Sequence, residues 1–130
     1  MKVIPESKNS KLIGLEASRL GCRVFRNNRG LFLTLDGKNK VRAGLEADYC
    51  ADWIGFYPMT ITKDMVGKKI AVFTSVEAKK SDWVKPKNDT EKGQQKWAEF
   101  VTSNGGIGFM CQSAEKMKEK LKDHLTLFNS

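Results

Sequence analysis

Histidine is almost absent from this chain of 130 residues, in which His124 is the one example. Most zinc hydrolase sites and Ser-His or Cys-His triads place a histidine beside other fixed residues, so histidine-based chemistry is largely excluded and His124 is expected to be a solvated residue at a helix end. The three cysteines, Cys22, Cys50 and Cys111, form no CxxC pair and are odd in number. This excludes a complete disulfide framework and a cysteine zinc site. We expect the three cysteines to be small buried apolar residues of a protein in a reducing compartment.

Long apolar runs are also missing. No run approaches the roughly 20 residues that a membrane-spanning helix needs, and the N-terminal segment has no apolar core typical of a secretory signal. Apolar residues make up 40% of the chain and charged residues 29%, the usual balance of a folded globular protein. We therefore expect a single domain over residues 1–130, located in the cytoplasm and without a membrane partner.

Positive charge is in excess. Lysine and arginine number 23 against 15 aspartates and glutamates, which gives a net charge of +8. A basic surface attracts polyanions over a Debye length of about 8 Å at physiological salt, so nucleic acid is the leading partner class. The alternative is a net charge that serves solubility alone.

Hydrophobic periodicity and turn residues predict an α/β fold with elements in the order α-β-β-β-β-α-β-α. In chain order the elements are residues 5–20, 22–25, 31–35, 53–57, 70–76, 94–103, 107–111 and 114–127. On the first helix Glu6, Ile13, Ala17 and Leu20 recur on one face, which points Glu6 toward whatever the helix packs on. Residues 38–48 and 80–92 are expected to be exposed loops.

Three acid-x-Lys triplets occur: Glu6-Ser7-Lys8, Asp36-Gly37-Lys38 and Glu77-Ala78-Lys79. Only the third follows an apolar strand, where the period of two places Glu77 and Lys79 on the same face. A carboxylate there costs solvation free energy unless it binds a cation or a hydrogen-bond donor.

Asp52 stands 25 residues earlier, at the start of the predicted strand 53–57. If strands 53–57 and 70–76 pair, Asp52 lies beside Glu77. Two carboxylates suit a hard cation such as Mg²⁺, with Lys79 next to the metal. The alternative is a solvated Glu-Lys pair at a sheet end.

Five motifs in order carry a resemblance. They are Phe25-Arg26-Asn27-Asn28-Arg29-Gly30, Val41-Arg42-Ala43-Gly44, Ala51-Asp52-Trp53-Ile54-Gly55, Val76-Glu77-Ala78-Lys79, and Gln94 with Trp97 ahead of Gly105-Gly106. Together they resemble the VRR-NUC domain, the virus-type replication-repair branch of the PD-(D/E)xK nuclease superfamily. The likeness covers nearly the whole chain and implies a restriction-endonuclease-like core, a mixed central β-sheet flanked by helices. Two departures are Ala51, where many members carry serine, and the long connection 80–92.

The resemblance also implies residue roles. The implied ligands of a Mg²⁺ or Mn²⁺ ion are Asp52, Glu77, the carbonyl of Ala78 and the helix acid Glu6, with Glu16 as the alternative to Glu6. Lys79 matches the lysine that orients or helps deprotonate the attacking water. Gln94 matches a glutamine that completes the site from the second helix.

Five cations flank the predicted site and are candidates for phosphate contacts: Arg26, Arg42, Lys80, Lys85 and Lys87. Trp83 is a plausible base contact, whereas Trp53 and Trp97 lie on apolar faces and are expected in the core.

The resemblance implies a metal-dependent, structure-specific DNA endonuclease. Its expected substrate is branched DNA such as a four-way (Holliday) junction, and its expected form is a homodimer, in the host cytoplasm if the source is viral. The resemblance also implies in-line attack that leaves a 5′-phosphate and a 3′-hydroxyl. The alternatives are a less selective nickase or flap nuclease, and a catalytically silent DNA-binding module.

Overall fold

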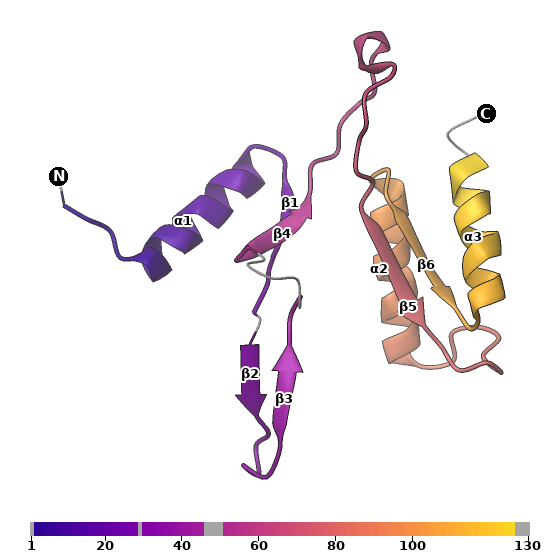
Figure 1. Cartoon of the computed structure of the whole chain (residues 1–130), viewed down its shortest axis with the longest axis horizontal. Helices are drawn as coiled ribbons and strands as arrows, with labels where there is room; N and C mark the ends of the chain where they lie inside the picture. Colours follow the sequence, from indigo (N-terminus) through magenta and orange to yellow (C-terminus); the bar gives the residue numbers. More distant parts are fainter. Residues whose placement is uncertain (1, 29, 46–50, 127–130) are drawn as a thin grey trace. The chain divides into compact units, whose positions relative to one another are not determined.

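The structure is a computed structural model that describes residues 2–28, 30–45 and 51–126. The chain forms two compact units, Met1–Thr60 and Ile61–Ser130, which we call the first and second units (Figure 1). The described residues contain three α-helices and small sheets of antiparallel and parallel strands, so the predicted mixed α/β class is confirmed. A restriction-endonuclease-like core and a single domain over 1–130 stay predictions.

The first unit consists of one helix and four short strands. These are α1 (Glu6–Arg19), β1 (Arg23–Arg26), β2 (Gly30–Leu33), β3 (Lys40–Ala43) and β4 (Trp53–Phe56). Gly21, with a φ of 99°, ends α1 as predicted, because the left-handed conformation that closes the helix is open to glycine. β1 pairs antiparallel with β4, and β2 pairs antiparallel with β3.

The packed face of α1 differs from the predicted one. Ser10 and Gly14 are buried, whereas Ile13 is 56% exposed and Leu20 61% exposed. A Cβ at Gly14 would lie 2.5 Å from the Trp53 ring, so the helix packs through its small residues. The prediction that Ile13 and Leu20 lie on the packed face is therefore wrong.

The strand β3 lies where an exposed loop over 38–48 was expected. A turn at Asp36-Gly37 builds this hairpin: Thr34 N–H donates to the Asn39 carbonyl at 2.9 Å, and Lys38 N–H donates to Asp36 Oδ1 at 2.9 Å. Asp-Gly is a typical hairpin turn. Residues 46–50 of the predicted loop lie outside the described residues.

The second unit is a β-α-β-α arrangement. Its elements are η1 (Lys63–Met65), β5 (Thr74–Ala78), α2 (Asp89–Ser103), β6 (Ile107–Cys111) and α3 (Ala114–Thr126). β5 and β6 are parallel, with α2 as the crossover between them. Gly108 of β6 faces α2, where a Cβ would lie 2.7 Å from the Ala98 carbonyl oxygen. The alternate residues of β6 pack instead on α3, so the two helices cover opposite faces of the strand. The apolar cluster between β6 and α3 consists of Ile107, Phe109, Cys111, Met117 and Leu121.

One strand prediction is corrected in this unit. β5 spans Thr74–Ala78 rather than 70–76, and its partner is β6, whereas β4 pairs with β1. β4 belongs to the first unit and β5 to the second, so the pairing predicted between strands 53–57 and 70–76 stays a prediction. Sequence periodicity locates strands but leaves their long-range partners open.

The helix α2 begins at Asp89, five residues before the predicted start at Gln94, so the predicted loop 80–92 is shorter. Asn88 caps it, because its side chain accepts a hydrogen bond of 2.8 Å from Glu91 N–H.

Two smaller predictions have mixed outcomes. Cys111 is buried and Cys22 half-buried, while Cys50 lies outside the described residues. His124 was expected to be solvated, yet its ring lies 5.3 Å from that of Phe109. Among the helices of the described part of the chain, none has the length and apolar character needed to cross a membrane.

Candidate functional site

Glu77 and Lys79 lie at the C-terminal end of β5, on the side that α2 covers. The alternation along the strand puts them on the face of Ser75, whose Oγ accepts a hydrogen bond of 2.8 Å from Trp97 Nε1 on α2. The prediction that Glu77 and Lys79 share a face is confirmed. Trp97 packs here but keeps 37% of its surface exposed, so it borders the core rather than filling it.

Gln94 joins the two charged side chains. Its Nε2 donates to Glu77 Oε1 at 3.0 Å, and its Oε1 accepts a hydrogen bond of 2.5 Å from Lys79 Nζ. The carboxylate and the ammonium group are therefore held on opposite ends of one amide. The structure thus brings together three of the predicted catalytic residues.

Glu91 is a fourth member of this cluster, and sequence reasoning missed it. Its Oε2 lies 3.4 Å from Lys79 Nζ, and the two side chains are only 13% and 14% exposed. Burial alone would raise the pKa of the Glu91 carboxyl, but hydrogen bonds from Lys87 N–H and Trp83 Nε1, together with the charge of Lys79, hold that pKa below its ordinary value. The Asn-x-x-Glu cap at Asn88 is the sequence signal that places Glu91 in the first turn of α2.

The carbonyl of Ala78 faces the edge of β5 that is turned away from β6. Lys79 N–H donates to the Cys111 carbonyl at 2.8 Å. Ile107 N–H donates to the Phe73 carbonyl, also at 2.8 Å. Alternate residues of a parallel strand bond to the same neighbour, so the residues between them, Ala78 included, direct their backbone groups to the other edge.

The oxygens of this end of β5 suit a hard cation. The Glu77 side chain is exposed, and Ala78 adds a carbonyl on the open edge. Mg²⁺ commonly takes one or two carboxylates and completes its shell with water and substrate phosphate. In the part of the chain that the structure describes, no three His, Cys, Asp or Glu side chains gather as a metal-binding group. Glu77 and the Ala78 carbonyl offer two oxygen ligands at this end of β5, and a metal site here stays a prediction.

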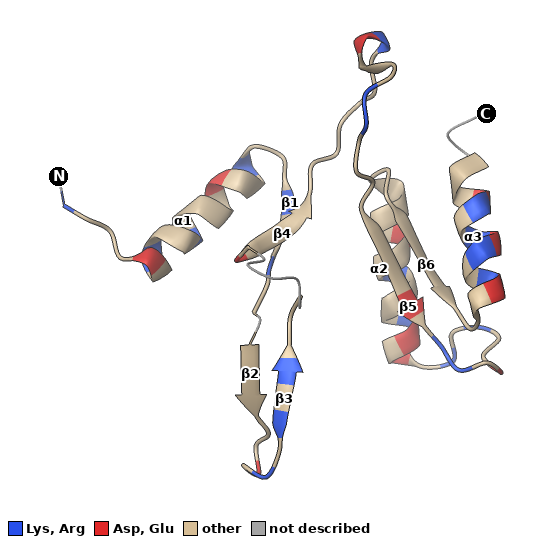
Figure 2. Ribbon diagram, in the orientation of Figure 1, with Lys and Arg blue, Asp and Glu red and all other residues tan. Residues whose placement is uncertain are grey.

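The connection from β5 to α2 is a folded loop that carries lysines (Figure 2). Three lysines are exposed on it: Lys80, Lys85 and Lys87. Their contacts with phosphate stay a prediction. Trp83 anchors the loop: its carbonyl accepts from Gln112 Nε2 at 3.1 Å, and its Nε1 donates to Glu91 at 2.7 Å. Trp83 is half-buried, and its role as a base contact stays a prediction.

In the first unit, Arg26 is bound by neighbouring side chains. Its Nη1 donates to Ser10 Oγ at 2.8 Å and its Nε donates to Asn28 at 3.2 Å. Its guanidinium lies 5.6 Å from the centre of the Trp53 ring, and Trp53 Nε1 in turn donates to the Ser10 carbonyl at 3.1 Å. Arg26 therefore helps to fasten β1 and β4 to α1, a role that sequence reasoning missed.

Asp52 immediately precedes β4 and has an exposed side chain. Its carbonyl accepts a hydrogen bond of 2.8 Å from Asn27 N–H, and Asn27 Nδ2 donates to the Ala51 carbonyl at 3.1 Å. The backbone around Asp52 is thus fixed while its carboxylate stays accessible. Asp52 belongs to the first unit and Glu77 to the second, so their meeting at one metal stays a prediction.

The two candidate helix acids differ in their surroundings. Glu16 is bound by Arg19, and this hydrogen bond lowers the pKa of the Glu16 carboxyl. Glu6 lies one turn before Ser10 on the same side of α1, with an exposed carboxylate. The ion pair makes Glu16 the less available ligand. Arg42, predicted in a loop, lies instead on β3 opposite Leu31 and is exposed.

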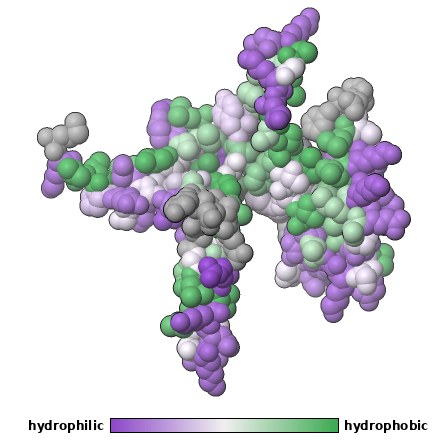
Figure 3. All heavy atoms as spheres, viewed as in Figure 1, coloured by the Kyte–Doolittle hydropathy of each residue, from purple (hydrophilic) through white to green (hydrophobic). Residues whose placement is uncertain are grey.

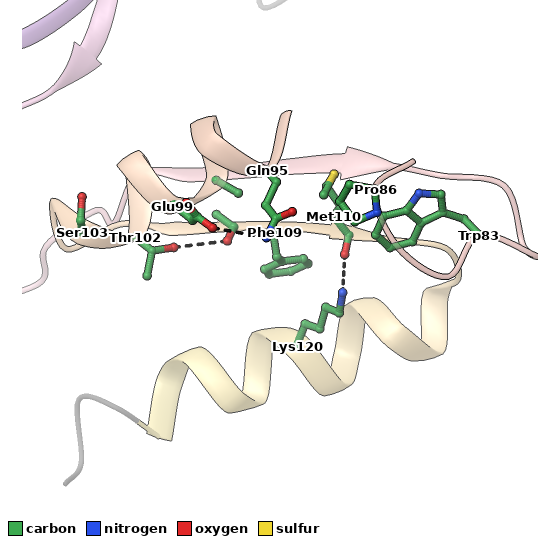
Figure 4. A pocket seen from close by; sticks show the side chains of 11 residues that line it. Trp83, Pro86, Gln95, Glu99, Thr102, Ser103, Phe109, Met110 and Lys120 are labelled. Carbon is green, nitrogen blue, oxygen red and sulfur yellow. Dashed lines mark hydrogen bonds between the residues drawn. The ribbon is translucent and has the colours of Figure 1, made fainter. Parts of the chain in front are cut away.

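A groove of about 490 Å³ opens beside β6 between α2 and α3 (Figure 4). Thr102 Oγ1 donates to the Gly108 carbonyl at 3.3 Å, and Lys120 Nζ donates to the Met110 carbonyl. The residues that line the groove include none of the predicted catalytic or metal-binding residues. This groove is therefore separate from the cluster around Glu77.

Comparisons with models of known protein families, with curated proteins and with solved structures gave no match.

Proposed function

We propose that this protein is a Mg²⁺- or Mn²⁺-dependent endodeoxyribonuclease with a restriction-endonuclease-like core, and that it cleaves branched DNA such as four-way junctions as a homodimer. The observation that carries the proposal is the amide of Gln94, which hydrogen-bonds both Glu77 at 3.0 Å and Lys79 at 2.5 Å. A solvated Glu-Lys pair needs no third residue between its charges. The bridge fits a site that must hold an acid and an ammonium group apart.

Each residue has a role in this proposal. Glu77 and the Ala78 carbonyl, together with Asp52 and the helix acid Glu6, would hold the metal ion. Such an ion, when bound, stabilises the negative charge that develops on the phosphate and acidifies a water molecule. Lys79 contributes a positive charge beside the attacked phosphate, and Gln94 keeps that ammonium group at a fixed position.

The charge of the chain supports DNA as the substrate. The net charge is +8, and Lys80, Lys85 and Lys87 are exposed on the loop that directly follows Lys79. Contacts from lysine to phosphate position the backbone without reading base sequence. Selection by the shape of the DNA, rather than by its sequence, follows from such contacts.

The test is cleavage of labelled four-way, flap, duplex and single-stranded DNA by the purified chain with Mg²⁺, Mn²⁺ or a chelator. We expect metal-dependent nicking that is fastest on the four-way junction. Cleavage of flap or duplex DNA at an equal rate would favour the less selective nickase. Binding without cleavage of any substrate would favour the silent DNA-binding module.

Variants connect the activity to the cluster. Glu77→Ala and Lys79→Ala should abolish nicking while salt-sensitive DNA binding remains. Matched controls are Glu115→Ala and Lys118→Ala, which remove the same charges from the exposed surface of α3. Equal losses in the control variants would show that net charge, and not this cluster, accounts for the effect.

A further inference from the structure

The carboxylate of Glu91 receives three donors from different parts of the second unit. Its Oε2 accepts from Trp83 Nε1 at 2.7 Å and lies 3.4 Å from Lys79 Nζ. Its Oε1 accepts from Lys87 N–H at 3.2 Å. One side chain thus links the lysine at the end of β5 to both halves of the loop that carries the exposed lysines.

The backbone of Glu91 is fixed as well. Its N–H donates to the Asn88 side chain at 2.8 Å in the helix cap. Gln94 follows three residues later, and residues at this spacing lie on the same side of a helix. Glu91 and Gln94 therefore both reach Lys79 from α2, and Lys79 Nζ lies between a carboxylate and an amide oxygen.

The contact between Glu91 and Lys79 is shielded from solvent. The Glu91 side chain is 13% exposed and the Lys79 side chain 14% exposed. Surface ion pairs, which contribute little, lack this shielding. The exposed pair of Arg19 and Glu16 provides the contrast, with side chains 71% and 52% exposed.

We propose that Glu91 is a positioning residue that holds the Lys79 ammonium group beside Gln94 and ties it to the lysine-bearing loop. The inference rests on the proposed nuclease function for its kinetic consequence, although the contact itself does not depend on that function. Glu91 acts through Lys79 and touches neither the DNA nor the metal. Because it restrains Lys79, its loss should slow the chemical step rather than weaken binding.

Glu91→Gln is the decisive variant, since it keeps the size of the side chain and an acceptor for Trp83 but removes the charge. We expect kcat to fall roughly 10- to 100-fold, the loss typical when a group that orients a site residue is removed. The KM for DNA should stay the same or decrease, because the variant has one negative charge fewer. Glu99→Gln, the same change on an exposed residue of α2, should leave kcat unchanged.

A second variant distinguishes the positioning role of Glu91 from an effect of misfolding. Trp83→Phe keeps an aromatic ring at this position but removes the donor to Glu91 Oε2, and should lower kcat less than Glu91→Gln does. Unchanged kcat in both variants, with Glu77→Ala inactive, would overturn the positioning role and leave the nuclease proposal in place. A parallel loss of kcat and DNA affinity together with a lower melting temperature would also overturn it, because the role would then be structural.

A measurement without catalysis separates the two proposals. Acetylation of lysines by an amine-reactive ester, followed by mass spectrometry, reports how freely each ammonium group is reached. We expect Lys79 to react faster in Glu91→Gln than in the unchanged chain, with Lys118 as the reference. If the acetylation rate of Lys79 rises in Glu91→Gln and the unchanged chain cleaves no DNA, the result supports the contact between Glu91 and Lys79 and contradicts the nuclease proposal. An unchanged Lys79 would overturn the contact, whatever the activity.

Discussion

The candidate residues of the two units are held in different ways. In the second unit Glu77, Lys79 and Gln94 are joined to one another through their side chains. In the first unit the backbone around Asp52 is fixed by Asn27, while the Asp52 carboxylate stays exposed. A side-chain network presets a geometry, whereas a lone exposed carboxylate keeps its rotamer freedom. The second unit is therefore the preorganised part of the proposed site.

The units also differ in what they bury. The buried apolar residues of the described chain are all in the second unit: Val101, Ile107, Phe109, Met110 and Cys111. In the first unit Ser10 and Gly14 are the buried residues of α1, and apolar side chains of β2 and β3 lie at the surface (Figure 3). Apolar burial is the main favourable term in folding. In the first unit Phe25 and Phe56 contact each other but are only half-buried, so strand pairing and polar contacts account for a larger share of its stability.

The largest effect is expected from Gly55→Ala in the first unit. A Cβ at this position would lie 1.8 Å from the Arg23 carbonyl oxygen, which leaves no room for it. We expect the pairing of β1 with β4 to be lost, observed as loss of amide exchange protection in those strands. Gly93→Ala, where a Cβ meets nothing within 4 Å, is the control. Intact protection in Gly55→Ala would contradict the described register.

Val101→Ala tests the core of the second unit. Val101 is completely buried, so its truncation should cost about 2 kcal/mol of unfolding free energy through lost burial and the cavity left behind. Ile13→Ala in the first unit removes an equally apolar but 56% exposed side chain and should change stability by about 0.5 kcal/mol or less. Urea unfolding measures both. Equal losses of unfolding free energy in the two variants would contradict the difference in apolar burial between the units.

Arg26→Ala should cost about 1 kcal/mol, because it removes a charged donor to Ser10 and the cation above the Trp53 ring. Arg42→Ala, on an exposed strand of the same unit, should leave stability unchanged. If Arg26 serves only to bind DNA, both variants keep their melting temperature and differ in affinity alone.

The smallest effect concerns pH. The folded pKa of Glu91 lies below its ordinary value, so its contribution to stability is present above that ordinary value and is lost as the pH falls through the folded pKa. The difference in unfolding free energy between the unchanged chain and Glu91→Gln should therefore shrink on acidification. Chemical denaturation at neutral and acidic pH measures it. A difference that grows in acid would contradict the direction of the shift.

Local patterns could be predicted from the sequence, and long-range ones could not. The period of two placed Glu77 and Lys79 on one face, and Gly21 marked the end of α1. β3 was missed because Asp36-Gly37 was considered only as part of an acid-x-Lys triplet and not as a hairpin turn. The partner of β4 was missed because periodicity carries no information about which strands pair.

The candidate site was predicted only as far as its single residues. Glu91 was missed because the helix was expected to begin at Gln94, which left Glu91 in a loop. Arg26 was assigned to DNA because its charge is visible in the sequence, whereas its contacts with Ser10 and Trp53 depend on how α1 packs. A charged residue in a motif can thus be a structural one.

The lysine on the outer side of β6 has a consequence for colloidal behaviour. Ile107–Cys111 is apolar and entirely buried, the composition that self-associates when a strand edge is free. Lys120 occupies the Met110 carbonyl, so an incoming strand must displace a cation before it can add to the sheet. A chain that ends before α3 lacks Lys120 and exposes Phe109. We expect this shortened chain to precipitate.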